Sequence, residues 1–123
     1  MKSLQYISIA LIFLSLFSCS SAKIFIVRHA EKSIVSKTDP PLTPEGEKRA
    51  MDLARALKGK KIKHIYSTQT TRTVSTAKPL SEALSIPIDL YAHDTMPKFL
   101  YRVLESGENA LVVGHSNTVL KMI

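Results

Sequence analysis

Two histidines in this chain each follow a short apolar run. His29 comes after residues 24–27 and Arg28, and His115 comes two residues after the run 110–113. β-Branched and aromatic residues favour strands, and the first run predicts a strand that is buried on both faces. In an open parallel sheet, ligands bind at the carboxyl ends of the strands. Both imidazoles are therefore expected at the edge of a sheet where chemistry is done.

Arginines complete a pattern that suits phosphoryl transfer. This reaction needs a nucleophile, fixed positive charge around the phosphate oxygens and an acid for the leaving group. A neutral imidazole is nucleophilic, provided that its other nitrogen donates to a carbonyl or carboxylate, which makes His29 the candidate nucleophile. The guanidinium groups of Arg28 and Arg72 match phosphate oxygens with paired hydrogen bonds. We expect His115 to bind the same group as an imidazolium, because a nearby dianion favours its charged form.

Each of these residues also has a structural explanation when it is taken alone. An Arg-His pair at the end of a strand is often a satisfied structural pair, and Arg72 at the start of a helix could be a solvated side chain. The combination of three strand ends, each with a group that carries positive charge, favours a phosphate site. The arrangement requires no metal or cofactor, and no Asp/His cluster has the spacing of metal ligands.

The elements that must position these residues alternate along the chain. Thr43 as N-cap and Pro44 at the first helical position predict the start of a helix, and Gly59 predicts its end. The other strands are expected at 62–66, at 86–90 and at 110–113, with a helix after each of them. Pro87 assigns the third strand to an edge. Such alternation predicts a mainly parallel sheet that is covered by helices on both faces.

Four motifs, in the same order, are similar to those of the histidine phosphatase superfamily, also called phosphoglycerate mutase-like. They are Arg28-His29-Ala-Glu-Lys, Leu42-Thr-Pro-Glu-Gly46, Ser67-Thr-x-x-x-Arg72-Thr-x-x-Thr76-Ala77 and Val113-Gly-His115-Ser-Asn-Thr118. The resemblance is to the small phosphatase branch, and it implies a three-layer α/β/α sandwich and a phosphohistidine intermediate. It gives the role of nucleophile to His29 and phosphate-binding roles to Arg28, Arg72 and His115.

The resemblance does not identify the general acid, because larger members carry it on an insertion that this chain lacks. Candidates are Asp94, His93 and Glu105, and we take Asp94 as the prediction. A weak or absent acid predicts a preference for good leaving groups. The expected function is a metal-independent phosphomonoesterase that acts on a small phosphorylated substrate. The alternatives are a mutase and a catalytically weak or inactive, lipid-anchored domain that binds phosphorylated ligands.

The first eighteen residues have the form of an export signal. Lys2 is followed by an uncharged apolar run at 7–17, which is too short to span a bilayer. The residues before Cys19 resemble a bacterial lipobox, so we expect residues 1–18 to be a signal, Cys19 to be lipidated and residues 19–22 to be a short linker. The mature protein would then be anchored to a membrane surface outside the cytoplasm. Cleavage near Ala22 and a buried core helix are the alternatives.

Residues 23–123 are expected to form one domain. The last strand and histidine leave room for fewer than two helical turns before Ile123, so we expect this domain to be C-terminally truncated. The formal net charge is +7 and suits either anionic substrates or nucleic acid. No arginine-rich helix or basic run with interleaved aromatic residues is present, so nucleic acid is the least favoured partner. Cys19 is the only cysteine, which excludes an intramolecular disulfide.

Overall fold

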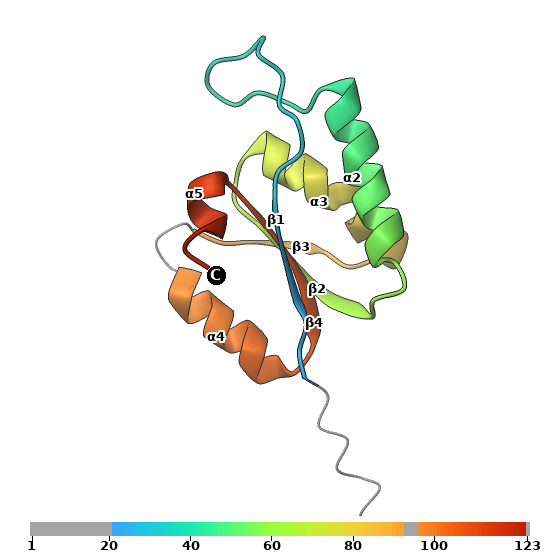
Figure 1. Cartoon of the computed structure of the whole chain (residues 1–123), viewed down its shortest axis with the longest axis vertical. Coiled ribbons are helices and arrows are strands. Elements are labelled where there is room, and N and C mark those ends of the chain that lie inside the picture. Colours follow the sequence, from blue (N-terminus) through green and yellow to red (C-terminus); the bar gives the residue numbers. More distant parts are fainter. Residues whose placement is uncertain (1–20, 93–95, 123) are drawn as a thin grey trace, which may run out of the picture.

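A four-stranded, fully parallel sheet forms the centre of the computed structural model, which describes residues 21–92 and 96–122 (Figure 1). The strands are β1 (Ile24–Arg28), β2 (Ile62–Ser67), β3 (Ile88–Leu90) and β4 (Asn109–Gly114), in the spatial order β1-β4-β2-β3. The helices are α2 (Pro44–Leu57), α3 (Thr71–Leu84), α4 (Met96–Ser106) and the short α5 (Ser116–Val119). Among the described residues, no helix is long and apolar enough to cross a bilayer.

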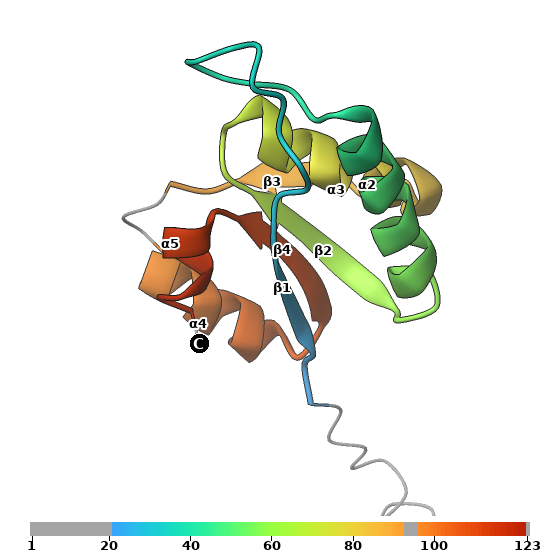
Figure 2. The ribbon, with the colours of Figure 1, turned by 45° about the horizontal axis from the view of Figure 1, so that its top comes forward.

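Helices cover both faces of the sheet, which confirms the three-layer α/β/α architecture (Figure 2). Side chains along a strand alternate between the faces, and β4 serves both layers. Leu111 and Val113 pack against α2 and α3, whereas Ala110 and Val112 pack against α4. All four of these β4 side chains have no exposed surface, so β4 is the central buried strand.

The prediction that residues 24–27 are buried on both faces is wrong. Among the described residues, β1 pairs only with β4, and the side chains of residues 24–27 are half-buried. An apolar run indicates that a strand packs against helices, but the place of that strand in the sheet depends on strands that are distant in the sequence. The strand predicted at 86–90 is shorter in the structure, where β3 begins at Ile88, after Pro87. Its predicted edge position is confirmed, because within the described part of the chain β3 pairs only with β2.

The N-terminus of α2 follows the predicted capping pattern. The Thr43 side chain accepts a hydrogen bond from the N–H of Gly46 at 3.0 Å, and Pro44 is the first helical residue. The predicted end at Gly59 is confirmed, since the last helical residue is Leu57, Lys58 is the C-cap and Gly59 is the first residue beyond it. The left-handed conformation in the following turn belongs to Lys61, with a φ of 53°.

A close backbone contact fixes α2 against the segment that follows β1. A Cβ atom on Gly46 would lie 2.4 Å from the carbonyl oxygen of Glu31, so only glycine permits this approach. The Thr43 N–H donates to the same carbonyl at 2.8 Å, and Lys32 forms an antiparallel bridge with Leu42. These contacts close the base of the loop at 33–41, which extends above the sheet near α2 and α3 (Figure 1).

Candidate active site

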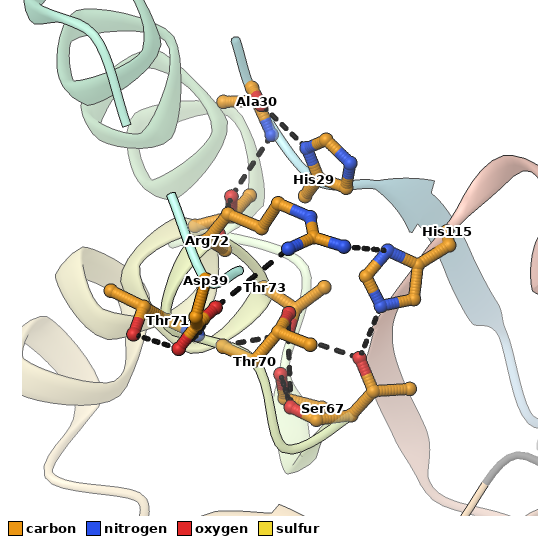
Figure 3. A network of polar contacts seen from close by, with 11 residues as sticks. His29, Ala30, Asp39, Ser67, Thr70, Thr71, Arg72, Thr73 and His115 are labelled. Carbon is orange, nitrogen blue, oxygen red and sulfur yellow. Dashed lines mark hydrogen bonds and ion pairs between the residues drawn. The ribbon is translucent and has the colours of Figure 1, made fainter. Parts of the chain in front are cut away.

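His29 lies at the carboxyl edge of the sheet, one residue beyond β1. Its backbone N–H donates to the carbonyl of Gly114 at 2.9 Å, which continues the pairing of β1 with β4 and brings His29 close to His115. Its ring nitrogen Nδ1 lies 2.7 Å from the carbonyl oxygen of Ala30 (Figure 3). A carbonyl can only accept, so Nδ1 carries the hydrogen in this contact and Nε2 keeps its lone pair. The ring therefore presents a nucleophilic nitrogen on the side away from Ala30.

The surroundings of His29 favour its neutral form. Burial lowers the pKa of His29 below its ordinary value of 6.5, and the positive charges of Arg72, Arg28 and Lys32 lower it further. The hydrogen bond to the Ala30 carbonyl acts in the opposite direction but is outweighed. Because the neutral imidazole is the nucleophilic form, the site keeps His29 ready to react near neutral pH.

Arg72 and His115 lie together beside His29. Arg72 is in the first turn of α3, and its Nη2 is 3.4 Å from Nδ1 of His115. The ring centroids of His29 and His115 are 5.4 Å apart, at an interplanar angle of 66°. The Arg72 side chain is mostly buried, and its Nε has no hydrogen-bond acceptor in the described part of the chain. A buried donor without an acceptor is costly, and a bound oxyanion that reorients the guanidinium can remove that cost.

Asp39 reaches this cluster from the loop at 33–41. One of its oxygens lies 3.7 Å from Nη1 of Arg72, and its carboxylate accepts hydrogen bonds from the N–H and the hydroxyl of Thr71. These bonds to Thr71 lower the pKa of Asp39, and Arg72 lowers it further. Asp39 thus holds the loop on the N-terminus of α3 as an ionised carboxylate. No signal in the sequence linked this loop residue to the site.

Threonine hydroxyls inside the protein connect the site residues. The hydroxyl of Thr76 accepts from the N–H of Ala30 at 3.0 Å and donates to the carbonyl of Arg72 at 2.7 Å. The hydroxyl of Thr68 lies 3.1 Å from Nε2 of His115. Hydroxyl side chains are frequent in the segment after β2, and in a sequence such residues more often indicate helix caps than ligands. Thr76 stands in one of the four motifs, and this was the one indication in the sequence that it belongs to the site.

The other predicted site residues are not part of the contacts among His29, Arg72 and His115. Arg28 is exposed at the end of β1 and, together with His29, lines a cleft of about 560 Å³ beside α2. Glu105 is exposed near the C-terminal end of α4, at the opposite edge of the sheet from His29, which disfavours it as the acid. Asp94, His93 and the predicted lipidation site Cys19 lie outside the described residues.

No three His, Cys, Asp or Glu side chains within the described ranges are grouped so that they could hold a metal ion. The groups that converge on the site are the guanidinium of Arg72 and the imidazoles of His29 and His115, with Asp39 as the counter-ion of Arg72. Such donors fit an oxyanion.

Comparison with known proteins identifies the family. The histidine phosphatase superfamily (branch 1) matches residues 24–93, which is more than half of the chain. The chain belongs to this superfamily. The match includes Arg28, His29 and Arg72, whereas His115 lies beyond it and joins the group through the fold.

Relatives and solved structures agree with this assignment. The protein named probable phosphoglycerate mutase GpmB of Escherichia coli is 36% identical over an alignment of 72 residues, with a coverage of 54% of this chain and 34% of that protein. This chain therefore spans about a third of the length of the curated relatives that it matches.

Two solved structures have the same fold. The protein histidine phosphatase SixA, solved with tungstate, is 23% identical, with a TM-score of 0.67 over 78% of this chain and 70% of that chain. YhfR of Bacillus stearothermophilus is 18% identical, with a TM-score of 0.70 over 84% of this chain and 78% of that chain. At these identities the similarity establishes the histidine phosphatase fold.

Proposed function

We propose that this protein is a phosphomonoesterase that transfers a phosphoryl group to His29 and then to water. The observation that carries the proposal is the contact between His29 Nδ1 and the Ala30 carbonyl, which leaves Nε2 as the free nucleophilic nitrogen. In the first step the Nε2 lone pair forms a bond to phosphorus, and the bond from phosphorus to the leaving oxygen breaks. In the second step water attacks the phosphohistidine, the P–N bond breaks, and phosphate is released.

The cations around His29 support a phosphoryl group as the substrate. Arg72 and His115 contact each other, and Arg28 is the last residue of β1, the strand that positions the nucleophile. We assign all three to phosphate binding, with Arg72 turning its guanidinium from its present partners toward the oxygens. Tungstate in the SixA structure is a tetrahedral oxyanion like phosphate, which supports a site of this type. We propose a small phosphorylated molecule as the substrate.

Protonation of the leaving group is the step with least support from the described residues. Asp39 contacts Arg72, but its lowered pKa keeps it ionised and makes it a poor proton donor. Asp94 remains our proposal for the acid. We therefore expect substrates with good leaving groups, such as aryl phosphates, to react fastest.

The test is hydrolysis of p-nitrophenyl phosphate by the full chain without added metal and in the presence of a chelator. We expect turnover by the natural protein and none above background by His29→Ala. His64→Ala is the matched control, because His64 pairs with Glu108 at the far edge of the sheet and should keep normal activity. Normal turnover by His29→Ala would exclude His29 as the nucleophile.

A phosphate-binding domain without catalysis is the second candidate, and the ionised state of Asp39 is the observation that favours it. Phosphohistidine is hydrolysed in acid but is stable in alkali. The reaction with a labelled phosphoryl donor is therefore stopped with alkaline denaturant. The phosphatase forms a labelled protein that depends on His29. A binding domain retains phosphate before denaturation but carries no covalent label afterwards.

We further propose that the protein is exported and anchored to a bacterial membrane through lipid on Cys19, as expected from residues 1–22. Labelling of cells with a fatty-acid analogue tests this. We expect label on the natural chain and none on Cys19→Ala, and equal labelling of both would contradict the anchor.

A further inference from the structure

A directed chain of hydrogen bonds runs from Arg72 through His115 into the protein interior (Figure 3). Arg72 Nη2 lies 3.4 Å from Nδ1 of His115, and Nε2 of the same ring lies 3.1 Å from the hydroxyl of Thr68. The Thr68 hydroxyl is 3.0 Å from that of Thr73. The Thr73 hydroxyl in turn lies 2.9 Å from the Thr68 carbonyl and 3.0 Å from the carbonyl of Thr70.

The chemistry of the two ends decides where each hydrogen lies. A guanidinium only donates, so Nδ1 of His115 accepts from Arg72 and carries no hydrogen. A carbonyl only accepts, so the Thr73 hydroxyl donates to the backbone and accepts from Thr68. The hydroxyl of Thr68 then donates to Thr73 and has its lone pair free for Nε2–H of His115. In this arrangement the ring hydrogen of His115 lies on Nε2.

We propose that Thr68 is a positioning residue that fixes the Nε2–H form of His115, so that Nδ1 is the nitrogen that takes up a proton and binds the phosphate group. This inference rests on the proposed phosphatase site and adds a function for a residue that does not itself contact the substrate. Thr68 acts through the ring of His115.

The same hydroxyl serves both charge states of the ring. When a phosphate dianion attracts the Arg72 guanidinium, Nδ1 of His115 loses its donor and can receive a proton from the monoanion or from solvent. The resulting imidazolium donates through Nδ1 to the phosphate and still donates through Nε2 to Thr68. A hydrogen bond from a charged donor is stronger than one from a neutral donor, so Thr68 favours the phosphate-bound state more than the free state.

Burial makes the hydroxyl difficult to replace. Thr68 is 6% exposed and Thr73 is not exposed at all, so water has little access to the position of the Thr68 hydroxyl. Valine at position 68 has the shape of threonine but removes the acceptor for Nε2–H. The ring is then free to carry its hydrogen on Nδ1, which turns a donor toward the guanidinium of Arg72.

The test combines Thr68→Val with two matched variants. Thr68→Ser keeps the hydroxyl, and Thr70→Val removes a different hydroxyl that lies 2.8 Å from the same Thr73 oxygen but outside the chain to His115. Binding of inorganic phosphate is measured by calorimetry, and the His115 tautomer is read from the nitrogen chemical shifts of the ring. Neither measurement requires turnover.

We expect Thr68→Val to bind phosphate at least about tenfold more weakly, the loss that corresponds to one hydrogen bond from a charged group. Thr68→Ser and Thr70→Val should stay within about threefold of the natural protein. The natural protein should show Nε2–H without phosphate and a doubly protonated ring with it.

An Nδ1–H ring in the ligand-free natural protein would overturn the inference even if Thr68→Val does not fold. Equal phosphate affinity of Thr68→Val and Thr68→Ser would also overturn it. Failure of the proposed function gives a different result, namely no phosphohistidine in the natural protein whatever the tautomer of His115.

Discussion

Thr76 connects the segment that carries His29 to helix α3. Replacing Thr76 by valine should therefore lower both the stability and the turnover of the protein. Its hydroxyl accepts from the N–H of Ala30 and donates to the carbonyl of Arg72, and the residue is only 3% exposed. Valine has nearly the same shape, so Thr76→Val removes these two hydrogen bonds without opening a large cavity.

The expected loss of stability follows from the two partners. The N–H of Ala30 is left in a buried position without this acceptor, which costs about 1–3 kcal/mol. The carbonyl of Arg72 lies within a helix and accepts mainly from the helical backbone, so its loss adds less. We expect a decrease of about 2 kcal/mol in the free energy of unfolding, which is roughly a 30-fold change in the unfolding equilibrium constant.

Urea unfolding measures this decrease, with Thr76→Ser as the control that keeps the hydroxyl. The serine variant should be close to the natural protein, and the slope of the transition should be the same in all three. Turnover should also fall in Thr76→Val, because Ala30 supplies the carbonyl that orients His29. Equal unfolding midpoints for the valine and serine variants would refute the reasoning, since only the valine variant lacks the hydroxyl.

Two further predictions concern the packing and the titration of the same segment. Gly46→Ala should destabilise the protein by about 1–3 kcal/mol, because the new Cβ meets the Glu31 carbonyl at 2.4 Å, whereas Gly59→Ala meets no atom within 4 Å and should change the unfolding midpoint little. Equal midpoints for the two variants would contradict this packing. His29 should titrate below its ordinary pKa of 6.5 when its ring is followed by NMR. Since the unfolded chain binds this proton more readily, the contribution of His29 to stability should be lost as the pH falls below 6.5. An NMR titration of the His29 ring with its midpoint above pH 6.5 would contradict the argument.

Local patterns in the sequence predicted the fold well where the structure depends on residues that are close to one another in the sequence. The Thr43-Pro44 cap, the strand ends at His29 and His115 and the edge position of β3 all follow from residue types and short spacings. Because the carboxyl ends of parallel strands meet at one edge, the alternation of strands and helices was enough to bring His29 and His115 within ring contact.

Features that depend on distant segments were not predictable in this way. In the part of the chain that the structure describes, β1 lies at one edge of the sheet with β4 between it and β2, and a single apolar run does not contain that information. The contact of Asp39 with Arg72 depends on how the loop at 33–41 folds onto α3, across 33 positions of sequence. The role of Thr68 likewise appears only when His115 arrives from the last strand.

The charge balance around Arg72 bears on whether the site turns over or only binds. An ion pair at 3.7 Å with an exposed carboxylate is weakened by solvent and contributes little, so an arriving phosphate can displace it. Asp39 does not leave the area, however, because two hydrogen bonds to Thr71 hold it at the start of α3. A fixed negative charge beside the guanidinium opposes a bound dianion and limits the affinity for the phosphate product. A domain that only retains phosphorylated ligands gains nothing from such a neighbour, whereas an enzyme must release phosphate in every cycle. The position of Asp39 therefore supports the phosphatase, and its ionised state counts against the enzyme only in that Asp39 is a poor proton donor.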